Sequence, residues 1–260
     1  MAEVEVRYEV KAQRAWLTID RPTVRNALGA ETINQLLAAI ERADADADVR
    51  AIVLTGAGEK VFCAGGDLSS MAPPDGFLSG HEGRARYAQL LTAFSRIGKP
   101  SVARVNGHAM AGGLGLVLAC DFAVMAEEAE LGLPEADRGL FPMMVTALLQ
   151  RHVGRKRALE LLLLGGRIDH KAALAWGLVN RTAPRAELDA AVDKLTGNLV
   201  DKSPAVLRLG RRAYFTVEDL ALPPALEHLN SQLSMNLLLE DAAEGVSAFL
   251  QKRAPEWKGK

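Results

Sequence analysis

SVARVNGHAMAGGLGLVLACD, residues 101–121, is the stretch that decides the fold. Its first part, Ser101 to Val105, is apolar and rich in valine, which predicts a buried strand. Gly107 then ends the strand, and the pair Gly112-Gly113 leads into a run of Leu, Val and Ala that suits a buried helix. Glycines at a helix start leave backbone N–H groups unhindered at the positive end of the helix dipole. The turn is therefore suited to an anion or a developing oxyanion, although phosphate loops and plain turns share this pattern.

Composition and charge exclude several classes of protein. The 260 residues are 49% apolar and 24% charged, which is typical of a soluble globular chain, and the net charge of −1 favours neither nucleic acid nor an anionic membrane as a partner. Cys63 and Cys120 lie in apolar segments, which indicates buried thiols in a reducing compartment. The N-terminus lacks the pattern of a signal peptide, and the longest apolar run, 114–125, is too short to span a bilayer. We expect a cytoplasmic protein.

Hydrophobic periodicity predicts strands alternating with helices up to about residue 200 and helices alone after it. The predicted strands cover residues 4–10, 15–19, 49–55, 61–63, 101–105, 122–126 and 129–133. The predicted helices of this part cover residues 31–42, 84–97, 145–153, 155–164 and 171–176, and the Gly-, Pro- and Ser-rich segment 69–83 is predicted to be a loop. We therefore expect an α/β core over residues 1–200 and a helical region over 201–260.

The helical region carries a wide apolar stripe. It is made of Leu226, Leu229, Leu233 and Leu237–Leu239. Such a stripe packs either against the core of its own chain or against another subunit. Because the stripe follows an apparently complete α/β body, the second alternative is favoured.

Three stretches share one design, an apolar strand followed by small residues with accessible N–H groups. They are FCAGGDL (62–68), VNGHAMAGGLG (105–115) and LGLPEADRGLFP (131–142). Two backbone N–H donors that converge on one oxygen form an oxyanion hole, and each donor contributes about 3 kcal/mol to stabilising the transition state in comparable sites. Such a site suits the enolate of a thioester.

These motifs resemble those of the crotonase, or enoyl-CoA hydratase/isomerase, superfamily. The resemblance also includes RPTVRNA (21–27), VGRKRA (153–158) and FLQKR (249–253), so it extends over nearly the whole chain in order and spacing. It implies a spiral of β-β-α units with a C-terminal helical region used in trimerisation, as a homotrimer or a dimer of trimers. It also implies an acyl-CoA thioester substrate, with no metal and no cofactor beyond the CoA moiety of the substrate.

The resemblance assigns roles to particular residues. The N–H groups of Gly66 and Gly112 would be the oxyanion donors, and Glu135 would carry the proton. The residues placed along CoA are Arg25, Ala27, Ala64, Asp67 and Leu68, with the adenine near the backbone of Ala64 and Gly66, and Phe249 and Lys252 from the tail or a neighbouring subunit. Asp67 is equally suited to a structural role in the turn. For His108, a structural role is favoured over that of a base.

One position departs from the family pattern. Two-glutamate hydratases carry one acid three residues after the second oxyanion glycine, where this chain has Gly115, so only Glu135 remains. Addition of water is then expected to be impaired, whereas a single carboxylate can still move a proton between two carbons of a dienolate. We therefore favour a 3-enoyl-CoA to 2-enoyl-CoA isomerase. The alternatives are an enoyl-CoA hydratase/dehydratase that uses one glutamate and a non-catalytic acyl-CoA binding protein.

A second departure follows Glu135. Many hydratases have a glycine-rich segment after the proline that corresponds to Pro142, whereas here Met143 and Met144 follow. Flexible methionines adapt to the shape of a ligand, so these two side chains are predicted to shape the acyl pocket.

Overall fold

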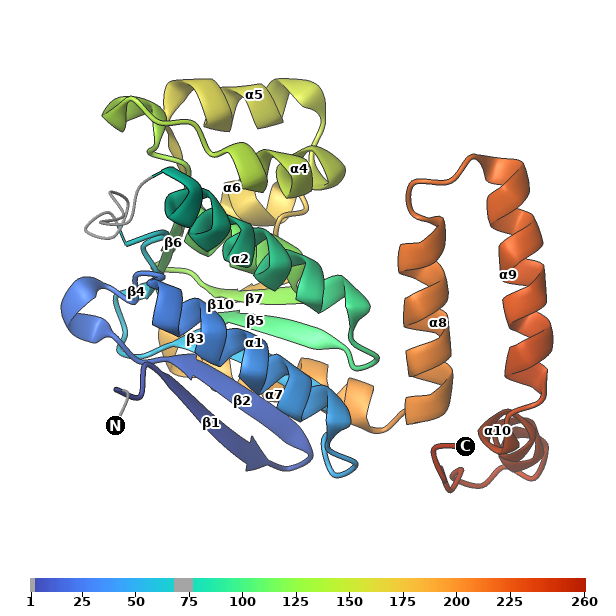
Figure 1. Cartoon of the computed structure of the whole chain (residues 1–260). Helices are drawn as coiled ribbons and strands as arrows, with labels where there is room; N and C mark the ends of the chain where they lie inside the picture. The colour runs from blue at the N-terminus through green and yellow to red at the C-terminus, as the bar shows by residue number, and fades with distance from the viewer. Residues whose placement is uncertain (1–2, 68–76) are drawn as a thin grey trace.

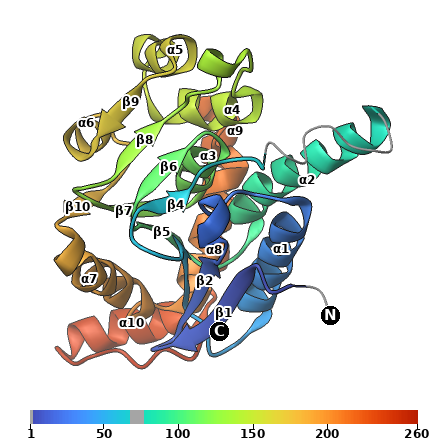
Figure 2. The same cartoon turned by 90° about the vertical axis from the view of Figure 1, so that its left-hand side faces the viewer.

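The computed structural model of the chain describes residues 3–67 and 77–260, and it contains two β-sheets with helices around them (Figures 1 and 2). The larger sheet has the strand order β1-β2-β3-β5-β7-β10. Its strands are β1 (Val6–Lys11), β2 (Arg14–Ile19), β3 (Ala51–Gly56), β5 (Ser101–Val105), β7 (Phe122–Ala126) and β10 (Arg181–Ala183). The β1–β2 hairpin is antiparallel and the other pairings are parallel. Every residue of β3 is buried, as expected for an apolar strand inside a parallel sheet.

The smaller sheet positions the three sequence motifs. Its order is β4-β6-β8-β9, with strands β4 (Val61–Cys63), β6 (His108–Met110), β8 (Glu130–Gly132) and β9 (Arg167–Asp169). Strands β4, β6 and β8 are parallel, and each ends within two residues of one motif segment: Ala64–Asp67, Ala111–Gly112 and Pro134–Glu135. Because parallel neighbours end at the same edge of a sheet, the three segments lie side by side.

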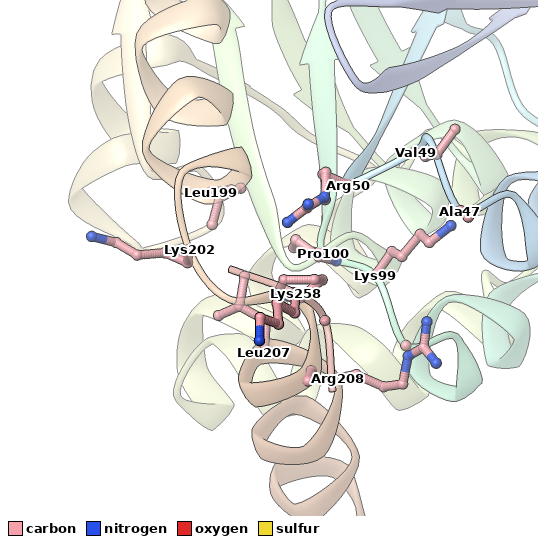
Figure 3. Close-up of a pocket in the computed structure, with 14 residues that line it drawn as sticks. Ala47, Val49, Arg50, Lys99, Pro100, Leu199, Lys202, Leu207, Arg208 and Lys258 are labelled. Carbon is pink, nitrogen blue, oxygen red and sulfur yellow. The ribbon is translucent and has the colours of Figure 1, made fainter. Parts of the chain in front are cut away.

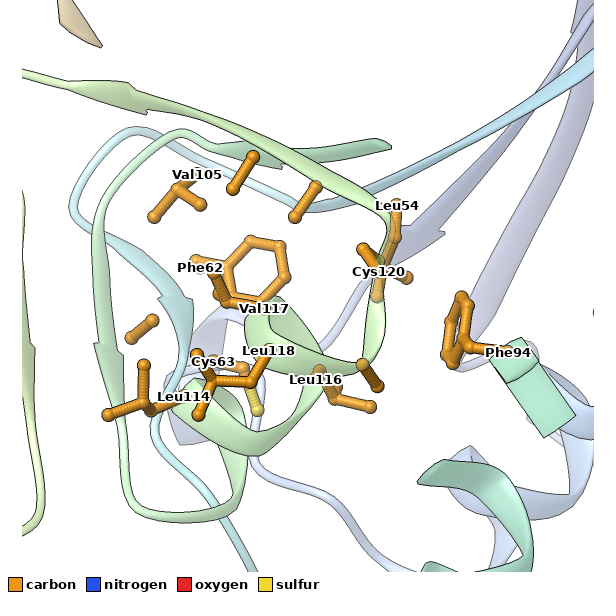
Figure 4. Close-up of a cluster of buried hydrophobic side chains, with 14 of the residues drawn as sticks. Leu54, Phe62, Cys63, Phe94, Val105, Leu114, Leu116, Val117, Leu118 and Cys120 are labelled. Carbon is orange, nitrogen blue, oxygen red and sulfur yellow. The ribbon is translucent and has the colours of Figure 1, made fainter. Parts of the chain in front are cut away.

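Helix α3 (Gly112–Ala119) joins the two sheets. It contacts β4 and β6 of the smaller sheet and β5 and β7 of the larger one, and it also packs against α2 (Phe77–Arg96) and α4 (Met143–His152). All of its residues after Gly112 are buried. Figure 4 shows Leu116, Val117 and Leu118 of this helix packed in one cluster with Phe62. A helix that is apolar on every side must be enclosed, and this explains its central place.

The remaining helices cover the sheets and form a separate arm. Helix α1 (Ala30–Ala45) packs on β1 and β2, and α7 (Leu188–Val200) packs on β3, β5, β7 and β10. Helix α6 (His170–Ala175) packs on β8, β9 and β10, and α5 (Arg155–Leu164) packs against α4. Helices α8 (Pro204–Val217), α9 (Leu222–Leu237) and α10 (Glu240–Leu250) project from this body (Figure 1). Arg211 of α8 joins the arm to the body, because its guanidinium pairs with Asp121 at 2.8 Å and donates to the carbonyls of Phe94 and Ile97.

The structure confirms the predicted α/β class and the predicted strands and helices of the core, with shifts of a few residues at their ends. The predicted loop 69–83 is wrong at its end, because α2 begins at Phe77 rather than at Arg84; residues 69–76 lie outside the described residues. Strands β6, β9 and β10, each of three residues, were not predicted. The boundary at residue 200 stays a prediction.

The leucine stripe is exposed on the single chain. Leu226, Leu233 and Leu237 expose 56%, 56% and 68% of their surface. The alternative in which these side chains pack against the core of their own chain is therefore wrong.

Candidate active site

The first two motifs meet at the edge of the smaller sheet. A Cβ atom placed on Gly65 would lie 2.6 Å from Ala111 Cβ and 3.0 Å from Gly112 N, so the loop that carries Gly66 is packed directly on the start of α3. Gly65 has φ +96°, a conformation that glycine adopts readily. Gly112 is the first residue of α3, and its N–H, like that of Gly66, has no acceptor in the described part of the chain. Two unpaired donors therefore lie together at the positive end of a helix.

The third motif brings a carboxylate to the same edge. Glu135 follows β8, and its carbonyl accepts the N–H groups of Arg138 at 2.9 Å and Leu140 at 3.0 Å, which fixes the backbone around it. Its Oε2 atom is buried and has no hydrogen-bond partner among the described residues. Burial raises the pKa of Glu135 above its ordinary value, while its own backbone N–H and the Arg138 guanidinium lower the pKa to a smaller extent. A desolvated carboxylate with one unpartnered oxygen is suited to accept a proton.

Tyr87 of α2 occupies the space beside Gly115. A Cβ atom on Gly115 would lie 2.2 Å from the Tyr87 hydroxyl oxygen and 3.1 Å from Val145 Cγ2. The Tyr87 side chain is buried, and its hydroxyl donates a hydrogen bond of 2.6 Å to the carbonyl of Gly112. Burial raises the pKa of Tyr87 well above its ordinary value, and the neighbouring Cys63 and Glu135 raise it further. The group beside Gly115 is therefore a neutral phenol.

Tyr87 was not predicted to be a site residue. The available signal was its helical spacing with Leu90, Leu91 and Phe94, all of which are buried in the structure. That spacing indicates a residue on the inner face of a helix, and nothing in it points to position 115.

Arg25, Ala27 and Ala64, which are predicted to lie along CoA, are located next to the first motif. The N–H of Ala64 donates to the carbonyl of Arg25 at 3.1 Å, and Leu28, beside Ala27, pairs with Gly66. The structure thus brings the predicted residues at 25, 27 and 64 together. Leu68 lies outside the described residues.

A buried asparagine holds this region in place, and it was missed by sequence analysis. The Asn26 side-chain amide donates to the carbonyls of Ala57 and Val61 at 3.0 and 2.9 Å, and its oxygen accepts the N–H of Arg21. Asn26 therefore ties the predicted CoA-side loop to the chain that enters β4. Its position inside RPTVRNA was the available signal.

Asp67 is engaged within the protein. Its carboxylate lies 3.3 Å from the guanidinium of Arg21, which also pairs with Glu5 at 3.2 Å. The backbone N–H of Asp67 donates to the carbonyl of Leu28. These contacts favour the structural role in the turn over the predicted contact with CoA.

The other predicted ligand residues are divided between two places. Met143 begins α4 and is 71% exposed, while Met144 is partly buried against the core. Phe249 is 81% exposed on α10, and Lys252 follows it. Helix α10 packs against α8 and α9, away from β4 and β6 (Figures 1 and 2). A single chain therefore does not bring Phe249 and Lys252 to Glu135.

Neighbouring histidine and cysteine side chains have structural environments. The Nδ1 atom of His108 accepts the backbone N–H of Glu130 at 3.1 Å, which is the structural role predicted for this histidine. Cys63 is buried beside the site, and burial raises its pKa to about 12. Its thiol is therefore protonated at neutral pH, and it is unsuited to act as a nucleophile.

A cleft of about 190 Å³ lies elsewhere, between the start of β3, the end of α7 and the start of α8 (Figure 3). Its cationic lining residues are Arg50, Lys99, Lys202, Arg208 and Lys258. Two of these cations are engaged: the Lys99 ammonium donates to the carbonyls of Ala43 and Asp46, and Lys258 pairs with Glu240 at 3.6 Å. Within residues 3–67 and 77–260, no group of His, Cys, Asp and Glu side chains is arranged to hold a metal ion, and no helix is long and apolar enough to cross a membrane.

Comparison with known proteins agrees with this geometry. The family model for enoyl-CoA hydratase/isomerase matches residues 9–260. A putative enoyl-CoA hydratase of Thermus thermophilus is 36% identical over 95% of this chain and 98% of its own, and a carnitinyl-CoA dehydratase of Escherichia coli is 35% identical over 94% of both chains. The crystal structure of an enoyl-CoA hydratase of Mycobacterium smegmatis matches with a TM-score of 0.94 at 33% identity, over 98% of this chain and 99% of the other. The chain therefore belongs to the enoyl-CoA hydratase/isomerase family of the crotonase superfamily.

Proposed function

We propose that this acyl-CoA enzyme is an isomerase that converts a 3-enoyl-CoA to a 2-enoyl-CoA. The Glu135 carboxylate takes a proton from the α-carbon of the thioester, and the electron pair moves into a dienolate whose oxygen accepts the N–H groups of Gly66 and Gly112. The Glu135 carboxyl group then returns the same proton to the γ-carbon. The substrate and product have the same composition, so protein groups alone complete the reaction.

The observation that carries this proposal is that, among residues 3–67 and 77–260, one carboxylate lies beside the two donors. Glu135 Oε2 is buried and unpartnered among the described residues, and the space next to Gly115 holds the Tyr87 phenol rather than a second acid. Addition of water is easier when a second carboxylate holds and orients the water molecule. Transfer of a proton between two carbons requires one carboxylate.

A second candidate function is hydration or dehydration with Glu135 alone. The names of the relatives favour it, since a putative enoyl-CoA hydratase and a carnitinyl-CoA dehydratase are 36% and 35% identical to this chain. A third candidate, binding of acyl-CoA without turnover, would use the same donors and leave Glu135 without a catalytic role.

Separate incubation with a 3-enoyl-CoA and a 2-enoyl-CoA distinguishes these candidates. We expect the double bond of the 3-enoyl-CoA to move, with little 3-hydroxyacyl-CoA formed from either ester, as followed by liquid chromatography and mass spectrometry. Rapid formation of the 3-hydroxyacyl-CoA from the 2-enoyl-CoA, without movement of the double bond, would support the hydratase and contradict the isomerase. Binding of both esters without any product would support the binding protein.

We further propose that the exposed stripe on α9 is a contact between subunits of a homotrimer or a dimer of trimers. The double variant Leu226→Glu/Leu233→Glu is expected to shift the protein to monomer, because each charge would have to be buried in an apolar contact. Light scattering after size-exclusion chromatography measures the mass. Ser231→Glu, on the opposite face of the same helix, is the matched control and is expected to leave the mass unchanged. A double variant with the mass of the unmodified protein would place the contact elsewhere.

A further inference from the structure

The packing between Tyr87 and Gly115 couples two segments that are distant in sequence. The distance of 2.2 Å from a Cβ on Gly115 to the Tyr87 hydroxyl oxygen is too short for any real contact, so position 115 accommodates only glycine while that oxygen is in place. The distance from the same Cβ to Tyr87 Cζ is 3.5 Å, which is an ordinary contact. The conflict is therefore confined to the hydroxyl oxygen and, at 3.1 Å, to Val145 Cγ2.

The same hydroxyl is hydrogen-bonded to the turn that carries Gly112. It donates to the carbonyl of Gly112 at 2.6 Å, in the residue whose N–H is one of the two proposed donors. A Cβ on Gly112 would also lie 3.2 Å from that hydroxyl, so the phenol rests directly on this turn. Ala111, just before it, has φ +53°, a conformation that is costly for a residue with a side chain. A turn with such a backbone needs an external contact to stay in one conformation.

We propose that Tyr87 is a positioning residue for the reaction: its hydroxyl, which lies where a side chain at 115 would project, holds the carbonyl of Gly112. This contact fixes the Gly112 backbone, so the N–H of the preceding Ala111–Gly112 peptide stays directed at the enolate oxygen. The phenol also lies close enough to Glu135 for the two groups to interact electrostatically. Tyr87 thus places a neutral hydroxyl where a second acid would lie, and this hydroxyl supports the oxyanion hole. This inference rests on the proposed role of Gly112 as an oxyanion donor.

Exchange of the α-protons of butyryl-CoA with deuterium oxide tests this role. Butyryl-CoA has no double bond, so it is neither isomerised nor hydrated, and its exchange reports only on enolate formation. Tyr87→Phe is expected to lower the maximal exchange rate about tenfold, as the loss of one buried hydrogen bond does, with little change in the concentration of ester that gives half of the maximal rate. NMR follows the exchange. Tyr8→Phe, on β1, is the matched control and is expected to exchange at the unmodified rate.

The pH profile separates this role from general loosening of the structure. Tyr87→Phe leaves a ring of the same size near Glu135, so the burial of Glu135 should be kept. The pH at which exchange begins to rise is therefore expected to stay unchanged while the maximal rate falls. Exchange at the unmodified rate in Tyr87→Phe would overturn the proposal. A fall in rate together with a shift of the profile would also overturn it, because Tyr87 would then act by shielding Glu135 from water.

A thermal double-mutant cycle tests the same contact without any turnover. Gly115→Ala is expected to lower the Tm in the unmodified protein, because its Cβ meets the hydroxyl oxygen. It should lower the Tm much less in Tyr87→Phe, where the contacts at 3.1 Å with Val145 Cγ2 and at 3.5 Å with the ring remain. Additive changes in Tm would show that the hydroxyl does not occupy this space. If the isomerase proposal fails in the enoyl-CoA assay, the exchange and Tm measurements still decide the role of Tyr87.

Discussion

Glu135→Gln is expected to lower kcat by about 10²- to 10⁴-fold, because it removes the only carboxylate that the described site places beside the oxyanion donors. Glutamine has almost the same shape and can keep a hydrogen bond, but it does not accept a proton from carbon. The ester should therefore still bind. Turnover of a 3-enoyl-CoA and exchange of the α-protons of butyryl-CoA measure the effect on two reactions that share the enolate.

Glu130→Gln is the matched control for this substitution. Glu130 lies on β8, where its carboxylate pairs with Arg167 at 3.1 Å and is partly exposed. We expect nearly unmodified rates from the control variant. A Glu135→Gln protein that keeps its full rate would show that another group moves the proton.

The pH dependence of kcat/KM should show the environment of Glu135. A base accepts a proton only in its ionised form, so the rate falls as the pH falls through the pKa of Glu135. Burial raises that pKa, and the rising limb of the profile should therefore lie above the ordinary glutamate value of about 4.3. Arg138→Gln is expected to move the limb to higher pH, because the guanidinium lowers the pKa. A limb at or below the ordinary value would contradict the buried environment.

The motifs that contain Gly66, Gly112 and Glu135 could be found in the sequence, and the resemblance to the crotonase superfamily assigned these residues their roles. That they meet depends on the parallel pairing of β4, β6 and β8, and β6 itself could not be predicted from its local pattern. The exposure of Leu233 and Leu237 could not be predicted in the same way. A leucine stripe indicates burial, and it does not indicate whether the covering surface belongs to the same chain.

The role of Tyr87 could not be predicted because it depends on how two helices pack. The start of α2 was expected at Arg84, since Gly80 and Gly83 weaken a helix, whereas the helix begins at Phe77. The sequence showed that a carboxylate was absent at Gly115. What fills the space depends on the distance between α2 and α3, and no local pattern contains that distance.

Gly113→Ala is expected to destabilise the protein by about 3 kcal/mol and to lower the rate of α-proton exchange as well. A Cβ on Gly113 would lie 2.2 Å from the carbonyl oxygen of Cys63 and 2.9 Å from its Cβ. Both atoms belong to β4, whose backbone cannot move away cheaply. The strain can be relieved only if the start of α3 moves away from β4, and that movement would separate the N–H groups of Gly112 and Gly66.

Gly210→Ala on α8 is the matched control, because a Cβ there meets no atom within 4 Å. Alanine is favoured over glycine inside a helix, so this variant is expected to gain about 0.5–1 kcal/mol of stability. Urea unfolding measures both free energies, and exchange of the α-protons of butyryl-CoA measures the site. Both glycines lie within helices. A loss of stability in Gly113→Ala and a gain in Gly210→Ala would therefore identify the contact with β4 as the cause. If Gly113→Ala has the same free energy of unfolding as Gly210→Ala, α3 can move away from β4 without loss of stability. If Gly113→Ala also kept full exchange, the close approach of α3 to β4 would not be what aligns the two donors.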